Sequence, residues 1–294
     1  MMKFFEEHAP FITNYWPFII SSTFICLGLF FVVMFVKNRG RYIRVFDKEN
    51  DVGSNIEEEV GETNDQVFMS IMKNEDVQIP YALPRLQPVA MIQKAQSFYE
   101  LMNTRRSCRM FSDEPVPREV IDNIIKAAGT APSGAHTEPW TYVVISQKDV
   151  KMKIREIIEE EEEINYRRRM GEKWVNDLKT FKTDWIKPYL VEAPYLILVF
   201  KQTYGLWPNG QKKTHYYNDL SVAISVGIMV SAITNAGLCS VTSTPLNAGV
   251  RLRDLLGRPV NEKCVILLPV GYPAKNAKVP NLQRKPLKDI AIYC

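Results

Sequence analysis

The stretch PYLILVFKQ, residues 194–202, is a continuous apolar run that predicts a β-strand buried on both faces. A second run of this kind is CVILLPVGY at 264–272, and WTYVVIS at 140–146 predicts a third strand. Helical patterns fill the intervals between these strands. The alternation predicts an α/β or α+β fold in which helices cover a central sheet.

Two helices are expected before the strand at 140–146. The first, KAQSFYELMNTRRS at 94–107, carries its apolar face on Phe98, Leu101 and Met102. The second, VPREVIDNIIKAAG at 116–129, ends in a glycine suited to a C-cap. The residues expected to face inward are Val120, Ile121, Ile124 and Ile125, and the expected C-cap is Gly129.

A long helix is expected at 216–237, YYNDLSVAISVGIMVSAITNAG, and it is apolar on nearly every side. A helix of this type is buried all round. In a domain of this size, the pattern predicts contact with a second copy of the chain.

The N-terminal region differs from the rest. PFIISSTFICLGLFFVVMFV, residues 17–36, has no charge, and twenty residues at helical rise reach ~30 Å, the thickness of a bilayer core. A cleaved signal peptide is the alternative, but its basic start and small-residue cleavage site are missing. We therefore expect residues 1–44 to form a membrane anchor. The basic residues that follow place the remaining chain in the cytoplasm, tethered to the plasma membrane or a vesicle membrane.

The remaining sequence divides into a linker and a domain. Residues 45–91 are acidic and poor in large apolar side chains, so they predict a disordered linker before a folded domain at 92–294.

The net charge of +4 is scattered and does not indicate a nucleic-acid partner. Five cysteines without a CxxC, together with three histidines, do not predict a metal site. The absence of GxGxxG and GxxxxGK[ST] disfavours a Rossmann or P-loop nucleotide site.

Three stretches carry candidate site residues. RRSCRMF at 105–111 supplies arginines that could pair with phosphate, although such a run can also be structural. GTAPSGAHTEPW at 129–140 would let a flat ligand approach the backbone, or it is a plain connector. TSTPLN at 242–247 offers hydroxyls that could bind a planar cofactor or cap the following helix.

A fourth stretch, EEEEEINYRRR at 159–169, is most simply a solvated helix with its acids before its bases. Glu162 and Tyr166 are four residues apart and share one face of that helix. A carboxylate on such a face could bind the ammonium group of a free amino acid.

Together these motifs resemble the nitroreductase-like flavoprotein superfamily. The order is RRS, a PSG loop, a hydroxyl stretch, GYP and a late basic residue. The segments TAPSGAHTEPW, IIEEEEEINY, HYYN, STPLN, LLGRP and LLPVGYP are similar to the dehalogenases of that superfamily that act on free halotyrosines. The resemblance covers almost all of residues 92–290 and implies an α+β fold with a central mixed sheet, in a domain-swapped homodimer that holds FMN noncovalently.

The resemblance also implies roles for individual residues. Those expected to bind FMN are Arg105, Arg106, Ser107, Cys108, Arg109, Pro132, Ser133, Thr242, Ser243, Thr244 and Arg284. Thr244 is the expected catalytic hydroxyl, donating to the flavin ring and favouring one-electron steps. The expected substrate contacts are Ala135, Glu162, Tyr166 and Lys187. Glu159, Glu160 and the bases at 167–169 are expected to remain surface charge.

The resemblance implies reductive removal of iodide from mono- and diiodotyrosine, with NADPH as the ultimate electron donor. Because the sequence lacks a Rossmann fingerprint, a partner reductase could relay the electrons from NADPH. Residues 151–189 are expected to form a lid that a bound zwitterion orders. A general nitro- or quinone reductase on the same fold is one alternative. A membrane-tethered protein that binds flavin without turnover is another.

Overall fold

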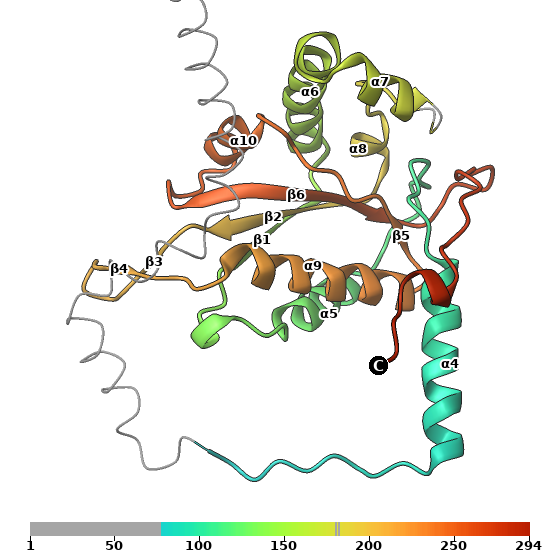
Figure 1. Cartoon of the computed structure of the whole chain (residues 1–294). Helices are drawn as coiled ribbons and strands as arrows, with labels where there is room; N and C mark the ends of the chain where they lie inside the picture. The colour runs from blue at the N-terminus through green and yellow to red at the C-terminus, as the bar shows by residue number, and fades with distance from the viewer. Residues whose placement is uncertain (1–77, 180, 182) are drawn as a thin grey trace, which may run out of the picture. The chain divides into compact units, whose positions relative to one another are not determined.

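The computed structural model describes residues 78–179, 181 and 183–294 (Figure 1). The expected membrane span and most of the linker lie outside this part of the chain. No helix of the described residues has the length and apolarity needed to cross a bilayer. The helices are α4 (Pro88–Thr104), α5 (Arg118–Gly129), η1 (Gly134–His136), α6 (Lys148–Ile164), η2 (Asn165–Arg169), α7 (Glu172–Lys179), α8 (Tyr189–Glu192), α9 (Asn218–Asn235), α10 (Gly249–Leu255) and η3 (Leu287–Asp289).

The main sheet contains the three predicted strands and a short fourth. In the order β1-β2-β6-β5, its strands are Trp140–Ile145, Tyr195–Gln202, Glu262–Gly271 and Cys239–Ser240. Every ladder in it is antiparallel. A mixed sheet was expected, but among the described residues parallel pairing is limited to a single bridge between Ser107 and Ser240. A separate hairpin consists of β3 (Gly205–Leu206) and β4 (Lys212–Lys213).

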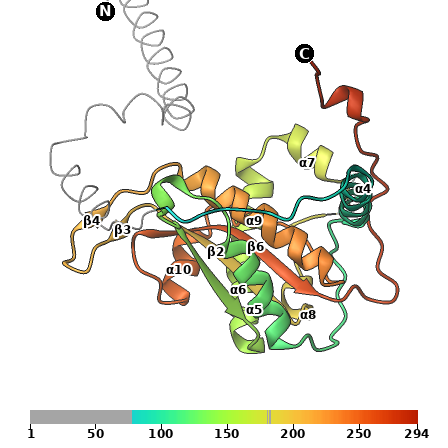
Figure 2. The ribbon, with the colours of Figure 1, turned by 90° about the horizontal axis from the view of Figure 1, so that it is seen from below.

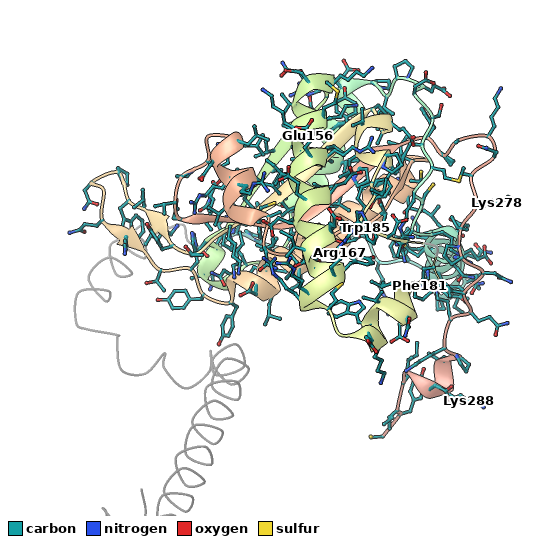
Figure 3. The ribbon with its side chains drawn as sticks, turned by 90° about the horizontal axis from the view of Figure 1, so that it is seen from above. Glu156, Arg167, Phe181, Trp185, Lys278 and Lys288 are labelled. Carbon is teal, nitrogen blue, oxygen red and sulfur yellow. The ribbon has the colours of Figure 1, made fainter. Side chains whose placement is uncertain are left out.

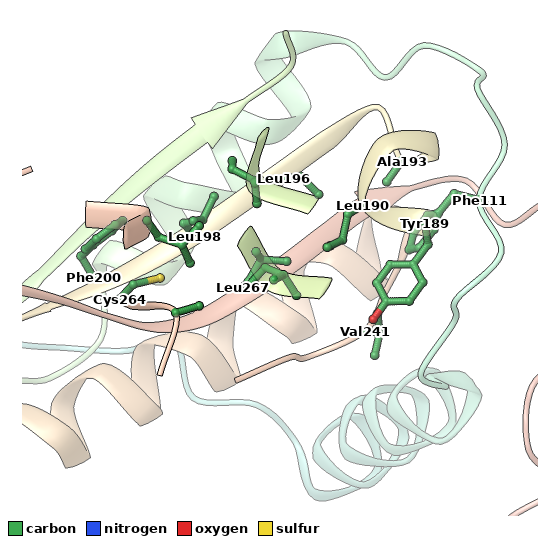
Figure 4. Packing of buried hydrophobic residues seen from close by; sticks show 14 residues of the cluster. Phe111, Tyr189, Leu190, Ala193, Leu196, Leu198, Phe200, Val241, Cys264 and Leu267 are labelled. Carbon is green, nitrogen blue, oxygen red and sulfur yellow. The ribbon is translucent and has the colours of Figure 1, made fainter. Parts of the chain in front are cut away.

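Strand β2 is buried on both faces, as its sequence predicts, because alternate side chains enter two different cores. Leu196, Leu198 and Phe200 pack with residues of α6, α8 and α10 (Figure 4). Ile197 and Val199 pack with residues of α5 and α9 on the opposite face. The sheet is therefore the middle layer of three, with α6, α7, α8 and α10 on one side and α5 and α9 on the other (Figure 1).

Helices α5 and α9 pack along the second face of the sheet, whereas α4 stands at its end (Figures 1 and 2). The buried residues of α5 are Ile121, Ile124 and Ala128, and its C-cap is Thr130 instead of the expected Gly129. The reason is that Gly129 keeps helical hydrogen bonding, so the chain leaves the helix one residue later.

Helices α4 and α9 both leave apolar side chains uncovered within one chain. No residue of α4 is buried, and Phe98 on its expected inward face is 57% exposed. Helix α9 was expected to be buried on every side, but Leu220 and Ile224 are 65% and 47% exposed. Among the described residues of the single chain, neither helix has a further layer against these positions.

The charged region is helical as predicted, with α6 followed by one π-helical turn, η2. Residues 151–189 were expected to lack the apolar burial that would order them, but Ile154 and Ile158 in the first part of this range belong to the core. The Lys151 side chain is also buried, and its ammonium donates to the Val191 and Ala193 carbonyls at 3.1 and 2.7 Å. Apolar residues placed four apart among the charges account for this difference.

Candidate active site

Residues from three segments that are distant in sequence line one cavity of about 370 Å³. Glu162 and Tyr166 come from α6 and η2, and Lys187 comes from the turn before α8. The segment after β5 adds three hydroxyl-bearing residues to the same wall, namely Thr242, Ser243 and Thr244. The structure therefore brings three of the four expected substrate contacts, Glu162, Tyr166 and Lys187, together with the expected hydroxyls of 242–244. The cavity also contains Arg109, Met170, Trp174, Leu178, Thr183, Tyr189, Val241 and Leu246.

Glu162 and Lys187 form an ion pair in this cavity, with Lys187 Nζ 3.7 Å from Glu162 Oε2. Both side chains are largely buried, at 14% and 6% exposed. Burial lowers the pKa of Lys187 below its ordinary value, and the Glu162 carboxylate opposes this effect. Two opposite charges held at this spacing away from bulk water suit a zwitterion, which can place its ammonium on one and its carboxylate on the other.

Glu159 was expected to be surface charge, and the structure gives it a positioning role instead. Its Oε1 accepts a hydrogen bond from the backbone N–H of Lys187 at 2.5 Å and pairs with Arg155 at 2.7 Å. The Lys187 ammonium also donates to the carbonyl of Asp184. These contacts fix Lys187 against α6. The signal in the sequence is that Glu159 lies three residues before Glu162 and so shares its helix face.

Tyr166 lies under the Lys187 ammonium, which is 5.7 Å from the ring centroid. Its ring meets Trp185 edge-on at 5.9 Å, and the Arg167 guanidinium lies 5.6 Å over Trp185 (Figure 3). Burial and then the nearby Glu162 carboxylate raise the pKa of Tyr166. The phenol is therefore neutral at physiological pH and can both donate and accept a hydrogen bond.

A second cavity of about 350 Å³ contains Arg105 and Arg106. Arg284 reaches the same place, because its Nη2 donates to the Arg105 carbonyl at 3.2 Å. We refer to Arg105, Arg106 and Arg284 as the arginine cluster. Burial, then Arg284 and Arg106, lower the pKa of Arg105. Within the described part of the chain, none of the three guanidinium groups pairs with a carboxylate.

The arginine cluster lacks a counter-charge of its own, and a phosphate dianion would supply one. The segment that follows it leads toward the substrate cavity. Ser107 and Arg109 line a third cavity of about 650 Å³, which shares Arg109, Thr183 and Tyr189 with the substrate cavity. Tyr189 is buried beside Phe111 and Val241, and burial raises its pKa (Figure 4). A ligand with a phosphate at one end and a planar ring at the other would fit this run of cavities.

The expected FMN contacts Pro132 and Ser133 and the expected substrate contact Ala135 are not among the residues that line these three cavities. Their loop leaves α5 at the far end of the sheet from the arginine cluster (Figure 1). Gly134 there packs on the backbone of Tyr216, so closely that a β-carbon would lie 2.7 Å from the Tyr216 carbonyl oxygen. Ala135 holds a positive φ of 48°. One chain therefore supplies an incomplete set of the expected contacts.

Comparison with known proteins defines the class first. The sequence profile described as "Nitroreductase family" matches residues 102–272, which is more than half of the chain. The chain therefore belongs to the nitroreductase family.

Within that family its relatives are iodotyrosine deiodinases, and the chain belongs with them. The iodotyrosine deiodinase of Hydra vulgaris is 66% identical over 214 residues, covering 73% of this chain and 79% of the relative. That of Danio rerio is 60% identical over 232 residues, covering 79% of both chains. A crystal structure of oxidized iodotyrosine deiodinase bound to FMN and 3-iodo-L-tyrosine has a TM-score of 0.57 and 30% identity, covering 64% of this chain and 96% of that one.

Proposed function

We propose that this protein reductively removes iodide from free iodotyrosines, using bound FMN, and releases tyrosine. The observation that carries the proposal is the shared cavity of Glu162, Tyr166, Lys187 and the hydroxyls of 242–244. In this cavity, charged groups that can bind a free amino acid lie beside hydroxyls that can contact a flavin ring. The deiodinases to which the chain is similar, one of them with FMN and 3-iodo-L-tyrosine bound, support the same activity.

The residues present fit FMN. The arginine cluster offers three cations to the phosphate, and Ser107 and Arg109 lie between that cluster and the substrate cavity. The hydroxyls of Thr242, Ser243 and Thr244 can donate to the polar edge of the ring. Bound FMN supplies the electrons for breaking the carbon–iodine bond. We propose that the Thr244 hydroxyl would hydrogen-bond the ring and favour one-electron steps. Cys108 is included among the FMN contacts because it stands between two of them, Ser107 and Arg109.

The chain's own residues bind and orient the substrate. Glu162 accepts from the ammonium and Lys187 donates to the carboxylate, while the Tyr166 ring lies beside Lys187, 5.7 Å from its ammonium. Contacts to both the ammonium and the carboxylate fix the position of the iodinated ring, so the substrate binds in one orientation. Iodine acidifies the phenol, and a backbone N–H such as that of Ala135 would further favour the phenolate.

A homodimer would complete this site. Pro132, Ser133 and Ala135 would then reach the FMN of the partner subunit, since they are remote from their own arginine cluster. The exposed apolar residues of α4 and α9 support this assembly: Phe98, Ile224 and Ile228 line one open apolar cavity of about 480 Å³. Covering such a surface in water is favourable in proportion to its area.

A lid shorter than the one expected would close the site. Asn165 is fully buried, and its amide donates to the Leu246 carbonyl at 3.2 Å, so α6 is anchored up to that point. Beyond it, the described residues from 166 to 184 include exposed Trp174, and none of their described side chains is buried. We propose that this segment moves and that a bound zwitterion orders it, excluding water from the ring.

Three further proposals rest on the sequence. Residues 17–36 would anchor the protein in the plasma membrane or a vesicle membrane, with residues 92–294 in the cytoplasm. NADPH would be the ultimate electron source. Because the sequence lacks a Rossmann fingerprint, a reductase partner would relay those electrons.

The test compares substrates on the reduced, FMN-loaded protein. Iodotyrosine should yield iodide and tyrosine far faster than 2-iodophenol yields iodide, because the phenol lacks the zwitterion that Glu162 and Lys187 bind. A general nitro- or quinone reductase would reduce a nitroaromatic compound at least as fast as iodotyrosine. A protein that only binds flavin would release no iodide from either compound.

A further inference from the structure

Two cysteine thiols, Cys108 and Cys239, meet beside the arginine cluster, and the chemistry proposed above uses neither of them. The backbone N–H of Cys108 donates to the Ser240 carbonyl at 3.1 Å, and Ser107 and Ser240 form a parallel bridge. The two segments therefore lie side by side. Cys108 and Cys239 both line the cavity of about 350 Å³ that contains Arg105, so their side chains face the same space.

The surroundings make these two thiols unequal. The Cys108 thiol lies 3.2 Å from the Met110 carbonyl oxygen, and contact with the Cys239 side chain, with help from nearby Arg109, lowers its pKa despite its burial. The same contact and burial raise the pKa of Cys239. The thiolate is the nucleophilic form of cysteine, so Cys108 is the reactive member. Cys239 keeps its proton and stands ready to attack a modified Cys108, as a resolving cysteine does.

We infer that Cys108 and Cys239 are a thiol oxidation site, at which hydrogen peroxide forms an intramolecular disulfide that loosens the hold of the arginine cluster on the FMN phosphate. The part that concerns FMN rests on the proposed function. The Cys108 thiolate attacks one peroxide oxygen, the O–O bond breaks, and the departing hydroxide takes up a proton to become water. The Cys239 sulfur then attacks the Cys108 sulfenic acid, and a second water leaves. The sulfurs lose two electrons and the peroxide gains them.

The disulfide would disturb the arginine cluster because forming it requires a movement of the chain segment next to Arg105 and Arg106. A disulfide needs an S–S distance of about 2.0 Å, which is shorter than any hydrogen-bonded contact between thiols. Cys239 is held in the sheet through its pairing with Gly271. Ser107 and Cys108 are held to Ser240 by an isolated bridge instead of a strand ladder, so the shift falls mainly on their segment, which connects directly to Arg105 and Arg106. Losing the alignment of one charge-assisted contact to the phosphate corresponds to roughly a tenfold weaker affinity for FMN.

The experiment uses the full-length, FMN-loaded protein in detergent, with Cys294→Ser to remove an exposed thiol. After hydrogen peroxide treatment and alkylation, peptide mass mapping reads the linkage, and FMN fluorescence in the ultrafiltrate reads cofactor release. We expect a linked Cys108–Cys239 peptide and an FMN dissociation constant raised about tenfold. Dithiothreitol should reverse both changes.

The matched variant adds Cys239→Ser to the same background. It removes the resolving thiol and keeps the arginine cluster, so peroxide should neither form the linkage nor release FMN. The inference is overturned if the linked peptide is absent from the parent, if the linked protein retains FMN fully, or if the variant releases FMN equally. The linkage is read by mass and FMN by fluorescence. A failure of the proposed deiodination would therefore appear separately, as missing iodide from untreated protein.

Discussion

At the residue scale, Glu162 and Lys187 divide the recognition of a zwitterion between them. Glu162→Gln keeps the shape of the side chain and removes the charge that binds the ammonium. We expect the dissociation constant of iodotyrosine to rise roughly ten- to hundredfold, as for the loss of a charge-assisted hydrogen bond, in a titration of flavin fluorescence. The binding of 2-iodophenol should hardly change.

Its neighbour provides the matched control for this variant. Glu163 lies on the exposed side of α6, where it pairs with Arg167 at 2.7 Å. Glu163→Gln should leave iodotyrosine binding within about twofold, since exposed pairs contribute little. Equal losses for iodotyrosine and iodophenol, or equal effects of the two variants, would remove Glu162 from substrate recognition.

The lowered pKa of Lys187 makes binding depend on pH. Burial holds this pKa below the ordinary value of 10.5, and a ligand carboxylate needs the charged ammonium. Affinity should therefore be complete near neutral pH and fall as pH rises through the lowered pKa. The measurement is the ratio of affinities for 3-(4-hydroxy-3-iodophenyl)propionate and 2-iodophenol from about pH 7 to 10. Both ligands carry an iodophenol, so their ratio isolates Lys187. A ratio that is flat or rises over this range would contradict the assignment.

Residue patterns predicted part of this site and missed the rest for a physical reason. Glu162 and Tyr166 could be paired from their spacing on one helix. The role of Glu159 depends on a backbone N–H 28 residues later, so no local pattern reveals it. The meeting of Cys108 and Cys239 likewise depends on a bridge between segments more than a hundred residues apart.

At the element scale, the proposed lid of residues 166–184 can be tested by proteolysis. Trypsin should cut at the bases of 167–169 and at Lys173 in the free protein, and iodotyrosine should suppress this cutting several-fold because an ordered segment resists cleavage. The β3–β4 hairpin is the internal control, since Lys212 is exposed and lies outside the lid. Cutting within 166–184 that ignores the ligand, or equal protection at Lys212, would contradict a lid.

Helix α9 provides the test of the dimer. Ile224 is exposed in the single chain, and burying a carboxylate at its position is unfavourable. Ile224→Glu should yield monomers by light scattering. It should also lower FMN retention, because the loop of Pro132 and Ser133 would no longer reach the partner's site.

A substitution on the other side of the sheet is the control for the dimer. Val250 on α10 is similarly exposed, at 57%, and Val250→Glu should change neither assembly nor FMN retention. A fully dimeric Ile224→Glu protein would show that the interface lies elsewhere.

At the scale of the whole molecule, the layered α+β fold could be predicted because its central strands are continuous apolar runs. Strand direction could not be, and the sheet proved antiparallel in every ladder of the described residues apart from the bridge at Ser107. Nor does the sequence show that the loop with Ala135 lies at the far end of the sheet. Both features depend on the path of the chain between elements, which local patterns do not encode.

The most direct measurement is a single anaerobic turnover. The FMN-loaded protein is reduced with a stoichiometric amount of dithionite, iodotyrosine is added, and flavin absorbance and iodide are followed together. We predict that the flavin reoxidises while one iodide and one tyrosine form per FMN, and that 2-iodophenol leaves the flavin reduced on the same time scale. A flavin that stays reduced with iodotyrosine, or reoxidises without releasing iodide, would contradict the proposed deiodination.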